Sequence, residues 1–186
     1  MSKIDPNKTL PQIHNRSTVA KSRFFRIEQV DLEFSNGEKR EFERMAGAGR
    51  GAVMILPLKD RNTMLLIREY AAGTHSYQLG FPKGLIDPGE DAKQAANREL
   101  QEEAGYIAST LTHLHQVAMA PTFFDATMDL IIAEGLSPSV LPGDEPEPLE
   151  VIEWPVSEIN ALLARSDFTE ARCIAGLLLL QNWLKD

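Results

Sequence analysis

Short runs of apolar residues, several with alternating polar positions, recur through the N-terminal part of the chain and predict β-strands. Segments 23–34 and 38–45 flank Ser35-Asn36-Gly37, and Asn-Gly is a strong signal for the turn of a β-hairpin. The apolar positions change face within the first of these strands, which predicts a β-bulge near Glu28. Residues 1–20 are polar, contain two prolines and are expected to begin irregularly.

A glycine-rich junction at 47–51 separates this strand pair from the rest of the chain. An apolar strand segment follows it instead of a helix, so it does not match a phosphate-binding loop. Further predicted strands are 52–58, which we expect to end at Pro57, 64–70, 114–119, 128–133 and 151–154. Predicted helices are 92–104, capped by Asp91 and ended by Gly105, 156–164 and 169–184. This order favours a mixed α/β sandwich over a doubly wound parallel sheet.

Length and composition limit the class of protein. The 186 residues allow one domain, or one domain with an appendage. Apolar residues make up 43% and charged residues 25%, which excludes a disordered chain or a coiled coil. The longest apolar runs, 52–58 and 177–180, are far too short to span a membrane. The first twenty residues carry no apolar signal-peptide core, so we expect a cytoplasmic protein.

Two further counts exclude classes of chemistry. Cys173 is the single cysteine, which excludes a disulfide framework and a cysteine-based zinc site within one chain. The net charge of −8 disfavours nucleic acid as a partner, because such binding relies on clustered lysine and arginine. A small polyanion remains compatible with this charge if metal ions bridge it to acidic side chains.

The most informative side chains lie on the predicted helix 92–104. Glu99, Glu102 and Glu103 are spaced i, i+3 and i+4, so they share one face and repel one another. One interpretation is a solvated acidic helix face. The other is a site for Mg²⁺, which prefers carboxylate oxygens and bridges to phosphates. Pro88-Gly89 predicts a type II turn that brings the Lys83-Gly84 backbone near the first half of the helix, where a carbonyl would complete the site.

The segment 84–106 resembles a known family signature at every position. It matches the Nudix box, Gly-x5-Glu-x7-Arg-Glu-U-x-Glu-Glu-x-Gly-U, in which U is apolar. The matching residues are Gly84, Glu90, Arg98, Glu99, Leu100, Glu102, Glu103, Gly105 and Tyr106, the last being a mild departure at an apolar position. The chain is thus identified as a member of the Nudix hydrolase superfamily. The resemblance implies a Nudix α/β/α sandwich with a mixed sheet, preceded by a small antiparallel strand unit.

The resemblance also implies roles for the residues of the box. Glu99, Glu102 and Glu103 would bind the catalytic divalent metal, with a backbone carbonyl of Lys83 or Gly84. Glu90 and Arg98 would lie behind them, with Arg98 holding the glutamates in place, and Gly84 would serve backbone geometry. The expected metal is Mg²⁺, with Mn²⁺ as the alternative. In some members a box glutamate is the catalytic base, for which Glu102 is the candidate here.

Three features narrow the expected substrate. Pro121 lies sixteen residues after Gly105, an offset similar to the marker of the ADP-ribose pyrophosphatase branch. The unit around 23–45 resembles the N-terminal strand domain of that branch, which implies that 1–47 contributes to a dimer and an adenosine pocket, before a Nudix domain at 48–186. Segments 67–90 and 143–149 resemble bacterial enzymes that hydrolyse ADP compounds. The sequence departs at Gln78-Leu79-Gly80-Phe81, where many relatives have Glu-Leu-Pro-Ala.

Candidate residues outside the box come from the same resemblance. In the acidic loop 141–150, Glu145 is the first candidate for the base and Glu147 the second, the alternative being a solvated loop. Arg44 and Arg68 are candidates for diphosphate or ribose contacts because arginine has a planar fork suited to phosphate; the alternative is a surface ion pair. Phe25, or its neighbour Phe24, is a candidate to stack on adenine, the alternative being a core position.

These observations lead to one hypothesis and two rivals. The hypothesis is a homodimeric, metal-dependent hydrolase that acts on ADP-ribose, NADH or diadenosine polyphosphates and releases AMP, with no nucleic-acid or membrane partner. The first rival is a Nudix hydrolase for another substrate, such as a nucleotide sugar, coenzyme A or capped RNA. The second is a non-catalytic ADP-ribose sensor, although such proteins usually lose a box glutamate. The preferred substrate, the number of metals and the attacked phosphorus stay open.

Overall fold

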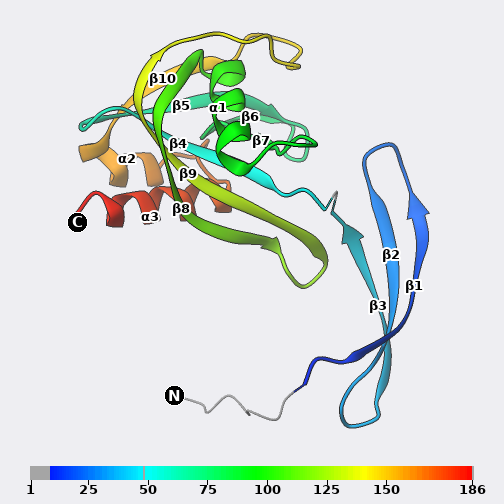
Figure 1. The fold of residues 1–186 in the computed structure, drawn as a ribbon. Helices are drawn as coiled ribbons and strands as arrows, with labels where there is room; N and C mark the ends of the chain where they lie inside the picture. The colour runs from blue at the N-terminus through cyan, green and yellow to red at the C-terminus, as the bar shows by residue number, and fades with distance from the viewer. Residues whose placement is uncertain (1–8, 48, 186) are drawn as a thin grey trace. The chain divides into compact units, whose positions relative to one another are not determined.

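Three antiparallel strands form the N-terminal part of the computed structural model, which describes residues 9–47 and 49–185. They are β1 (Gln12–Lys21), β2 (Arg26–Glu33) and β3 (Lys39–Ala46), paired in the order β1-β2-β3 (Figure 1). The end of β3 also pairs in parallel with residues 124–125. Residues up to 49 and the segment 119–126 thus make up one unit of the chain, and the remainder makes up a second.

The predicted hairpin is confirmed, whereas the predicted bulge lies in a different strand. Gly37 has a φ of 84°, and its N–H donates to the carbonyl of Phe34 at 2.9 Å. The register between β2 and β3 is unbroken, so β2 carries no bulge against β3. The register shift opposite Glu28 is in β1, which inserts Val19 between the partners of Ile27 and Glu28. The predicted bulge is therefore at the correct position along the sheet, next to Glu28, but the extra residue belongs to β1 and not to β2.

Residues 9–11 carry neither helix nor strand, in agreement with the expected irregular start, but β1, a strand that the sequence did not predict, begins at Gln12. Residues 1–8 lie outside the described residues. All ten side chains of β1 are exposed, so neither of its faces has to be apolar. Pairing with β2 satisfies the backbone N–H and C=O groups of β1. Because backbone hydrogen bonds do not depend on side-chain polarity, such pairing produces no pattern of apolar and polar residues. A strand of this kind cannot be identified from alternation alone.

The second unit is built around a mixed sheet, as predicted. Its strands are β4 (Ala52–Asp60), β5 (Thr63–Ala71), β6 (Ser76–Gly80), β7 (Lys83–Leu85), β8 (Tyr106–Ala120), β9 (Phe124–Pro138) and β10 (Glu150–Pro155). The adjoining ends of β8 and β9, within 119–126, belong to the first unit. β4 pairs in parallel with β9 and in antiparallel with β7. β5 pairs in antiparallel with β4, β6 and β10. β4 continues beyond Pro57, because its pairing with β9 extends to Pro57 and its pairing with β5 begins at Leu58.

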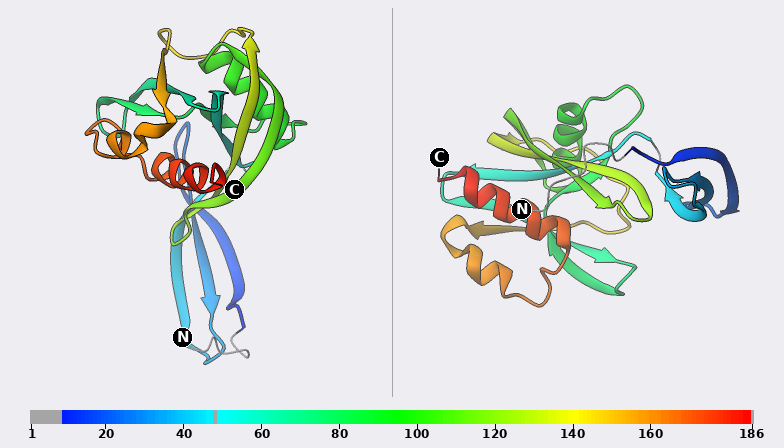
Figure 2. Two further views of the ribbon diagram at one scale, coloured as in Figure 1. Left: turned by 90° about the vertical axis from the view of Figure 1, so that its left-hand side faces the viewer. Right: turned by 90° about the horizontal axis from the view of Figure 1, so that it is seen from below.

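Two helices pack on opposite faces of this sheet. They are α1 (Ala92–Glu103) and α3 (Ala171–Trp183), while the predicted helix at 156–164 consists of a 3₁₀ turn, Val156–Glu158, and α2 (Ile159–Leu163). Val53 and Ile55 of β4 share a buried cluster with Leu100 of α1. Met54 and Leu56 instead lie against Gly176 of α3. Because successive side chains of a strand point to opposite faces, α1 and α3 cover the two sides of β4 (Figure 2).

Adjacent leucines on α3 provide a matched test of this packing. Leu177 is fully buried and Leu178 is 46% exposed. We expect Leu177→Ala to lower the free energy of unfolding by roughly 2–5 kcal/mol, because it removes apolar contacts and leaves a cavity. Leu178→Ala should change it by less than about 1 kcal/mol. Urea denaturation of both variants measures the difference, and equal losses would contradict the assigned buried face.

No helix among residues 9–47 and 49–185 is both long and apolar enough to cross a bilayer.

Candidate active site

The start of α1 is fixed by a turn and a capping box. The N–H of Glu90 donates to the carbonyl of Asp87 at 3.0 Å, and Gly89 has a φ of 92°, as the predicted Pro-Gly turn requires. The Asp91 carboxylate accepts the N–H of Gln94 at 2.9 Å, and the Gln94 side chain accepts the N–H of Asp91 at 2.8 Å. The predicted cap is therefore confirmed, and it fixes the residue at which α1 begins.

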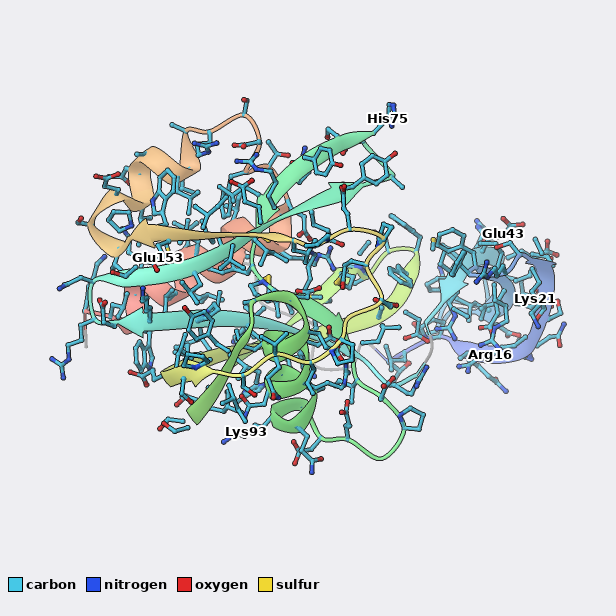
Figure 3. The ribbon with its side chains drawn as sticks, turned by 90° about the horizontal axis from the view of Figure 1, so that it is seen from above. Arg16, Lys21, Glu43, His75, Lys93 and Glu153 are labelled. Carbon is cyan, nitrogen blue, oxygen red and sulfur yellow. The ribbon has the colours of Figure 1, made fainter. Side chains whose placement is uncertain are left out.

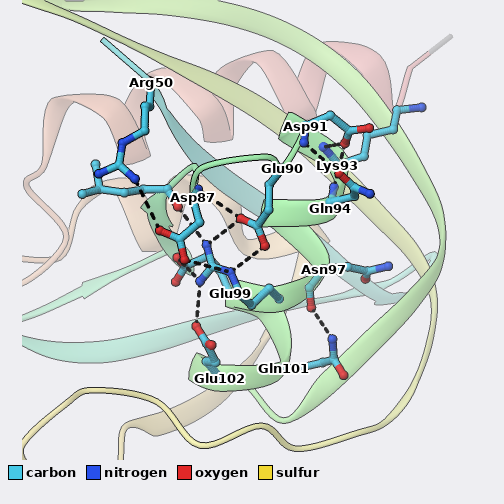
Figure 4. A network of polar contacts seen from close by, with 12 residues as sticks. Arg50, Asp87, Glu90, Asp91, Lys93, Gln94, Asn97, Glu99, Gln101 and Glu102 are labelled. Carbon is cyan, nitrogen blue, oxygen red and sulfur yellow. Dashed lines mark hydrogen bonds and ion pairs between the residues drawn. The ribbon is translucent and has the colours of Figure 1, made fainter. Parts of the chain in front are cut away.

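The guanidinium of Arg98 organises the acidic face of α1. Its Nη1 donates to Glu99 at 2.7 Å and to Glu102 at 2.9 Å. Its Nε donates to Glu90 at 2.9 Å, and its Nη2 donates to the carbonyl of Leu85 at 2.9 Å. The hydrogen bond to Glu90, followed by that to Glu99, raises the pKa of Arg98 despite partial burial. Figure 4 shows Glu90, Glu99 and Glu102 within this network.

Strand β7 lies directly against the same face. The N–H of Lys83 donates to the Glu103 carboxylate at 2.8 Å. A Cβ atom added at Gly84 would lie closer than 3.0 Å to the Glu99 carboxylate, so only glycine leaves room for that side chain. The sequence prediction placed this backbone near the first half of α1. It lies instead beside Glu99 and Glu103, in the second half, because β7 is held in antiparallel register along β4.

The carboxylates of this face are crowded and partly cut off from water. Glu99 and Glu103 are only 8% and 6% exposed. Burial raises the pKa of Glu103 to about 8, although the Lys83 N–H opposes the shift. Burial also raises the pKa of Glu99 against the effect of Arg98, and the charges of Glu102 and Glu145 add to it. In the metal-free protein, burial therefore favours the protonated, uncharged form of both carboxyls.

The donor atoms of this site suit a divalent metal. Carboxylate oxygens are the ligands that Mg²⁺ prefers, and a bound cation would favour the charged form of these buried carboxyls. Within 9–47 and 49–185, no three acidic, histidine or cysteine side chains come together closely enough to hold a metal ion as they stand. Arg98 Nη1 bridges Glu99 and Glu102 in their present arrangement. The carboxylates would therefore have to turn from the arginine toward the ion.

The acidic loop is tied to the end of α1. The N–H of Ser139 donates to the carbonyl of Gly105 at 2.9 Å, and that of Leu141 donates to the carbonyl of Gln101 at 3.3 Å. Glu145 is half-buried and near enough to Glu99 to raise its pKa. Glu147 is exposed and accepts a hydrogen bond from the hydroxyl of Tyr77. The two candidate bases thus have different surroundings, and Glu145 is the one that adjoins the box.

The residues predicted to contact substrate lie in ion pairs or on the surface. Arg68 contacts Glu150 at 2.9 Å and Asp167 at 2.7 Å. Arg44 contacts Glu28 at 3.1 Å and Asp125 at 3.0 Å. The side chains of Phe24 and Phe25 are 78% and 57% exposed, which excludes the alternative of a core position for either one in this chain. Ion pairing of the two arginines matches the alternative interpretation stated for them.

Sequence reasoning missed two interactions beside the site. The Lys83 ammonium lies 2.6 Å from the Glu69 carboxylate, and its pKa is raised because this pair outweighs the opposing effect of burial. Tyr77, whose hydroxyl reaches Glu147, was not a candidate either. The available signal was the unusual segment 78–81, which ends two residues before Lys83. It could not identify the partners, because Glu69 and Glu147 are distant in sequence.

Comparisons with known proteins agree with this geometry. Residues 49–175 match the NUDIX domain, and residues 11–44 match the NudE-type Nudix hydrolase N-terminal domain. The ADP compounds hydrolase NudE of Escherichia coli K12 is 53% identical over 94% of each chain. The ADP-ribose pyrophosphatase of Bacillus subtilis 168 is 29% identical over 88% of this chain and 91% of its own. A crystal structure of an ADP compounds hydrolase matches 97% of each chain, with a TM-score of 0.92 and 51% identity.

These matches confirm the family resemblance and the α/β class that the sequence predicted. The NUDIX match contains the whole box, from Gly84 to Tyr106, and the N-terminal match falls on the antiparallel strands β1 to β3. The chain therefore belongs to the Nudix hydrolases, with an N-terminal domain of the NudE type.

Proposed function

We propose that this enzyme hydrolyses the diphosphate of ADP compounds, among them ADP-ribose, NADH and diadenosine polyphosphates, and releases AMP. The observation that carries the proposal is the set of box carboxylates gathered between β7 and the acidic loop, in a chain 53% identical to an ADP compounds hydrolase. Hydrolysis of a diphosphate requires a positioned water and neutralisation of charge on the phosphoryl oxygens. This acidic site supplies ligands for the cation that such chemistry needs.

Each residue of the site has a distinct proposed role. Glu99, Glu102 and Glu103, with the backbone carbonyl of Lys83, would hold Mg²⁺, or Mn²⁺ in its place. When bound, the metal would supply Lewis-acid stabilisation of the diphosphate oxygens. Arg98 would keep the carboxylates oriented through its four contacts, and Glu90 would anchor that guanidinium. Gly84 would leave the space that the Glu99 carboxylate occupies.

Glu145 is the proposed base that takes a proton from the attacking water, with Glu102 as the alternative within the box. The half-buried position of Glu145 beside Glu99 supports the role of base for Glu145. Glu147 instead accepts a hydrogen bond from the hydroxyl of Tyr77. We expect Glu145→Gln to lower kcat by roughly 10²–10⁴-fold, the range for loss of a general base. Glu147→Gln should lower it by less than tenfold. Initial rates of AMP release measure both, and the reverse order would transfer the role to Glu147.

The N-terminal unit, 1–47, is the proposed site of dimerisation and of an adenosine pocket that includes Phe25 and Arg44, while Arg68 would contact the diphosphate. Support comes from apolar side chains that this unit leaves in solvent: Leu10, Ile13, Val19, Phe24, Phe25 and Phe42 are 44–93% exposed. Exposed apolar groups in such numbers mark an interaction surface. Sedimentation at micromolar concentration should give twice the chain mass of 20.7 kDa, and a 20.7 kDa species would reject the dimer.

Release of AMP from the purified protein tests the function. ADP-ribose, NADH, diadenosine triphosphate and UDP-glucose are each supplied with Mg²⁺ and, separately, with excess chelator. We expect AMP from the three adenosine compounds only when metal is present, and no hydrolysis of UDP-glucose. Hydrolysis of UDP-glucose alone would favour a nucleotide-sugar enzyme. Binding of ADP-ribose without any turnover would favour a sensor.

A further inference from the structure

A cavity of about 460 Å³ lies beside the site, between the β5–β6 hairpin, Lys83 and the first turn of α3. Its volume falls in the range that small-molecule sites occupy in proteins. Its polar lining includes Glu69, Gln78, Lys83, Thr169, Glu170 and Arg172. None of the roles proposed above uses its side-chain groups, because the Lys83 contribution to the metal site is a backbone carbonyl.

The charges of this cavity are balanced, which indicates the kind of group it would accept. The Lys83 ammonium is paired with Glu69 at 2.6 Å, and Arg172 is paired with Glu170. Two cations and two carboxylates give no net attraction for an anion. Each carboxylate has further lone pairs to accept hydrogen bonds from hydroxyl groups, and the ammonium has three N–H donors in all. The cavity therefore suits an uncharged group that both donates and accepts hydrogen bonds.

The uncharged residues that line the cavity also suit a neutral group with hydroxyls. The hydroxyl of Thr169 donates to the Gln78 carbonyl oxygen at 3.0 Å, which places an amide and a hydroxyl together on one side. Ile67, Leu79 and Gly80 provide apolar lining. A furanose ring has hydroxyl groups along its edge and C–H groups on its faces, and carboxylates are used elsewhere to bind ribose hydroxyls. A ribose is thus the chemical group that matches both kinds of lining.

The position of Lys83 joins this cavity to the proposed reaction. Its backbone N–H donates to Glu103 at 2.8 Å, while its side chain lies in the cavity wall and is 19% exposed. One residue therefore touches a proposed metal ligand at one end and the cavity at the other. Lys83 thus connects Glu103 to Glu69, one residue on each side of it.

We propose that this cavity binds the sugar attached to the second phosphate of the substrate, the half that is not released as AMP, with Glu69 and Gln78 as residues that determine specificity. The proposal rests on the proposed function, since it assigns a subsite within the same reaction. It implies that substrates with a ribose in this position gain affinity over substrates with the same diphosphate and no sugar.

The test compares AMP release from ADP-ribose with that from the methyl ester of ADP, which has the same diphosphate and no second sugar. We expect the wild type to prefer ADP-ribose in kcat/KM by at least tenfold. Glu69→Gln and Gln78→Leu should each reduce this preference by roughly tenfold, the effect of losing one hydrogen bond to a charged or buried partner. The loss should be mainly in KM, since neither side chain contacts the reacting atoms.

A matched control separates this role from a general effect of removing a charge. Glu153 is paired with Lys59 at a different edge of the same unit, and Glu153→Gln should leave the preference within twofold of wild type (Figure 3). Gln78→Leu keeps the Lys83–Glu69 pair intact, so it tests the cavity even if Glu69→Gln disturbs Glu103. An unchanged preference in both variants, or a wild type that cleaves the two esters equally, would overturn the inference. Failure of the wild type on both esters would instead reject the proposed function.

Discussion

Replacing Glu103 by glutamine is expected to remove most of the turnover while leaving the fold as stable as before or more so. Glutamine still accepts the Lys83 N–H, but it has no charge to offer a metal. Lewis-acid stabilisation is worth several kcal/mol, and each 1.36 kcal/mol is a factor of ten, so kcat should fall by roughly 10²–10⁴-fold. Turnover equal to wild type would reject a catalytic role for Glu103.

The same variant has a pH signature in the metal-free protein. The pKa of Glu103 is about 8 in the folded chain, above its ordinary value of 4.5. A raised pKa contributes stability that is fully present below 4.5 and is lost as the pH rises through about 8. Urea denaturation with chelator present should therefore show Glu103→Gln gaining stability over wild type between pH 5 and pH 8. A constant difference would contradict the burial of this carboxyl.

Gly84→Ala is expected to lower turnover without removing any charged group. The new Cβ would lie closer than 3.0 Å to the Glu99 carboxylate, which is 8% exposed and held by Arg98 at 2.7 Å. Glu99 must therefore move, and a displacement of about 1 Å at a catalytic group can lower the rate by roughly 10²-fold. Initial rates over a Mg²⁺ titration should show a lower kcat and a weaker apparent affinity for the metal.

Gly73→Ala is the matched control for this substitution. Nothing lies within 4 Å of a Cβ built at Gly73, and its φ is outside the positive range. Its kcat should stay within twofold of wild type. If Gly84→Ala also stayed within twofold, the space at Gly84 would not be needed by Glu99 during the reaction, and the assigned role of this glycine would be wrong.

Several elements could be predicted because their signals are local. Asp91 caps α1 and Gly105 follows it with a φ of 75°, so both ends of the helix are marked by neighbouring residues. The i, i+3, i+4 spacing places Glu99, Glu102 and Glu103 on one side of α1 wherever the helix packs. The Asn-Gly turn between β2 and β3 depends equally on adjacent residues, since it needs a positive φ at Gly37.

Other features depend on residues that meet only when the chain folds. Strand β1 is stabilised by backbone pairing with β2 and has no buried face to produce an apolar pattern. The Lys83–Glu69 pair requires β7 to be placed beside the β5–β6 hairpin. The residue type of Arg68 makes it a candidate phosphate ligand, but only its position in the fold shows that Glu150 and Asp167 are its partners.

The sequence by itself determined the family, the helix that carries the glutamates of the Nudix box and the mixed α/β class, because spacing, caps and turns act over a few neighbouring residues. Tertiary structure alone decided that Glu99 and Glu103 are buried, that Glu145 and not Glu147 adjoins them, and that Lys83 joins the site to a cavity. Burial and charge partners are set by contacts between distant segments, and these contacts are what shift a pKa and shape a binding site.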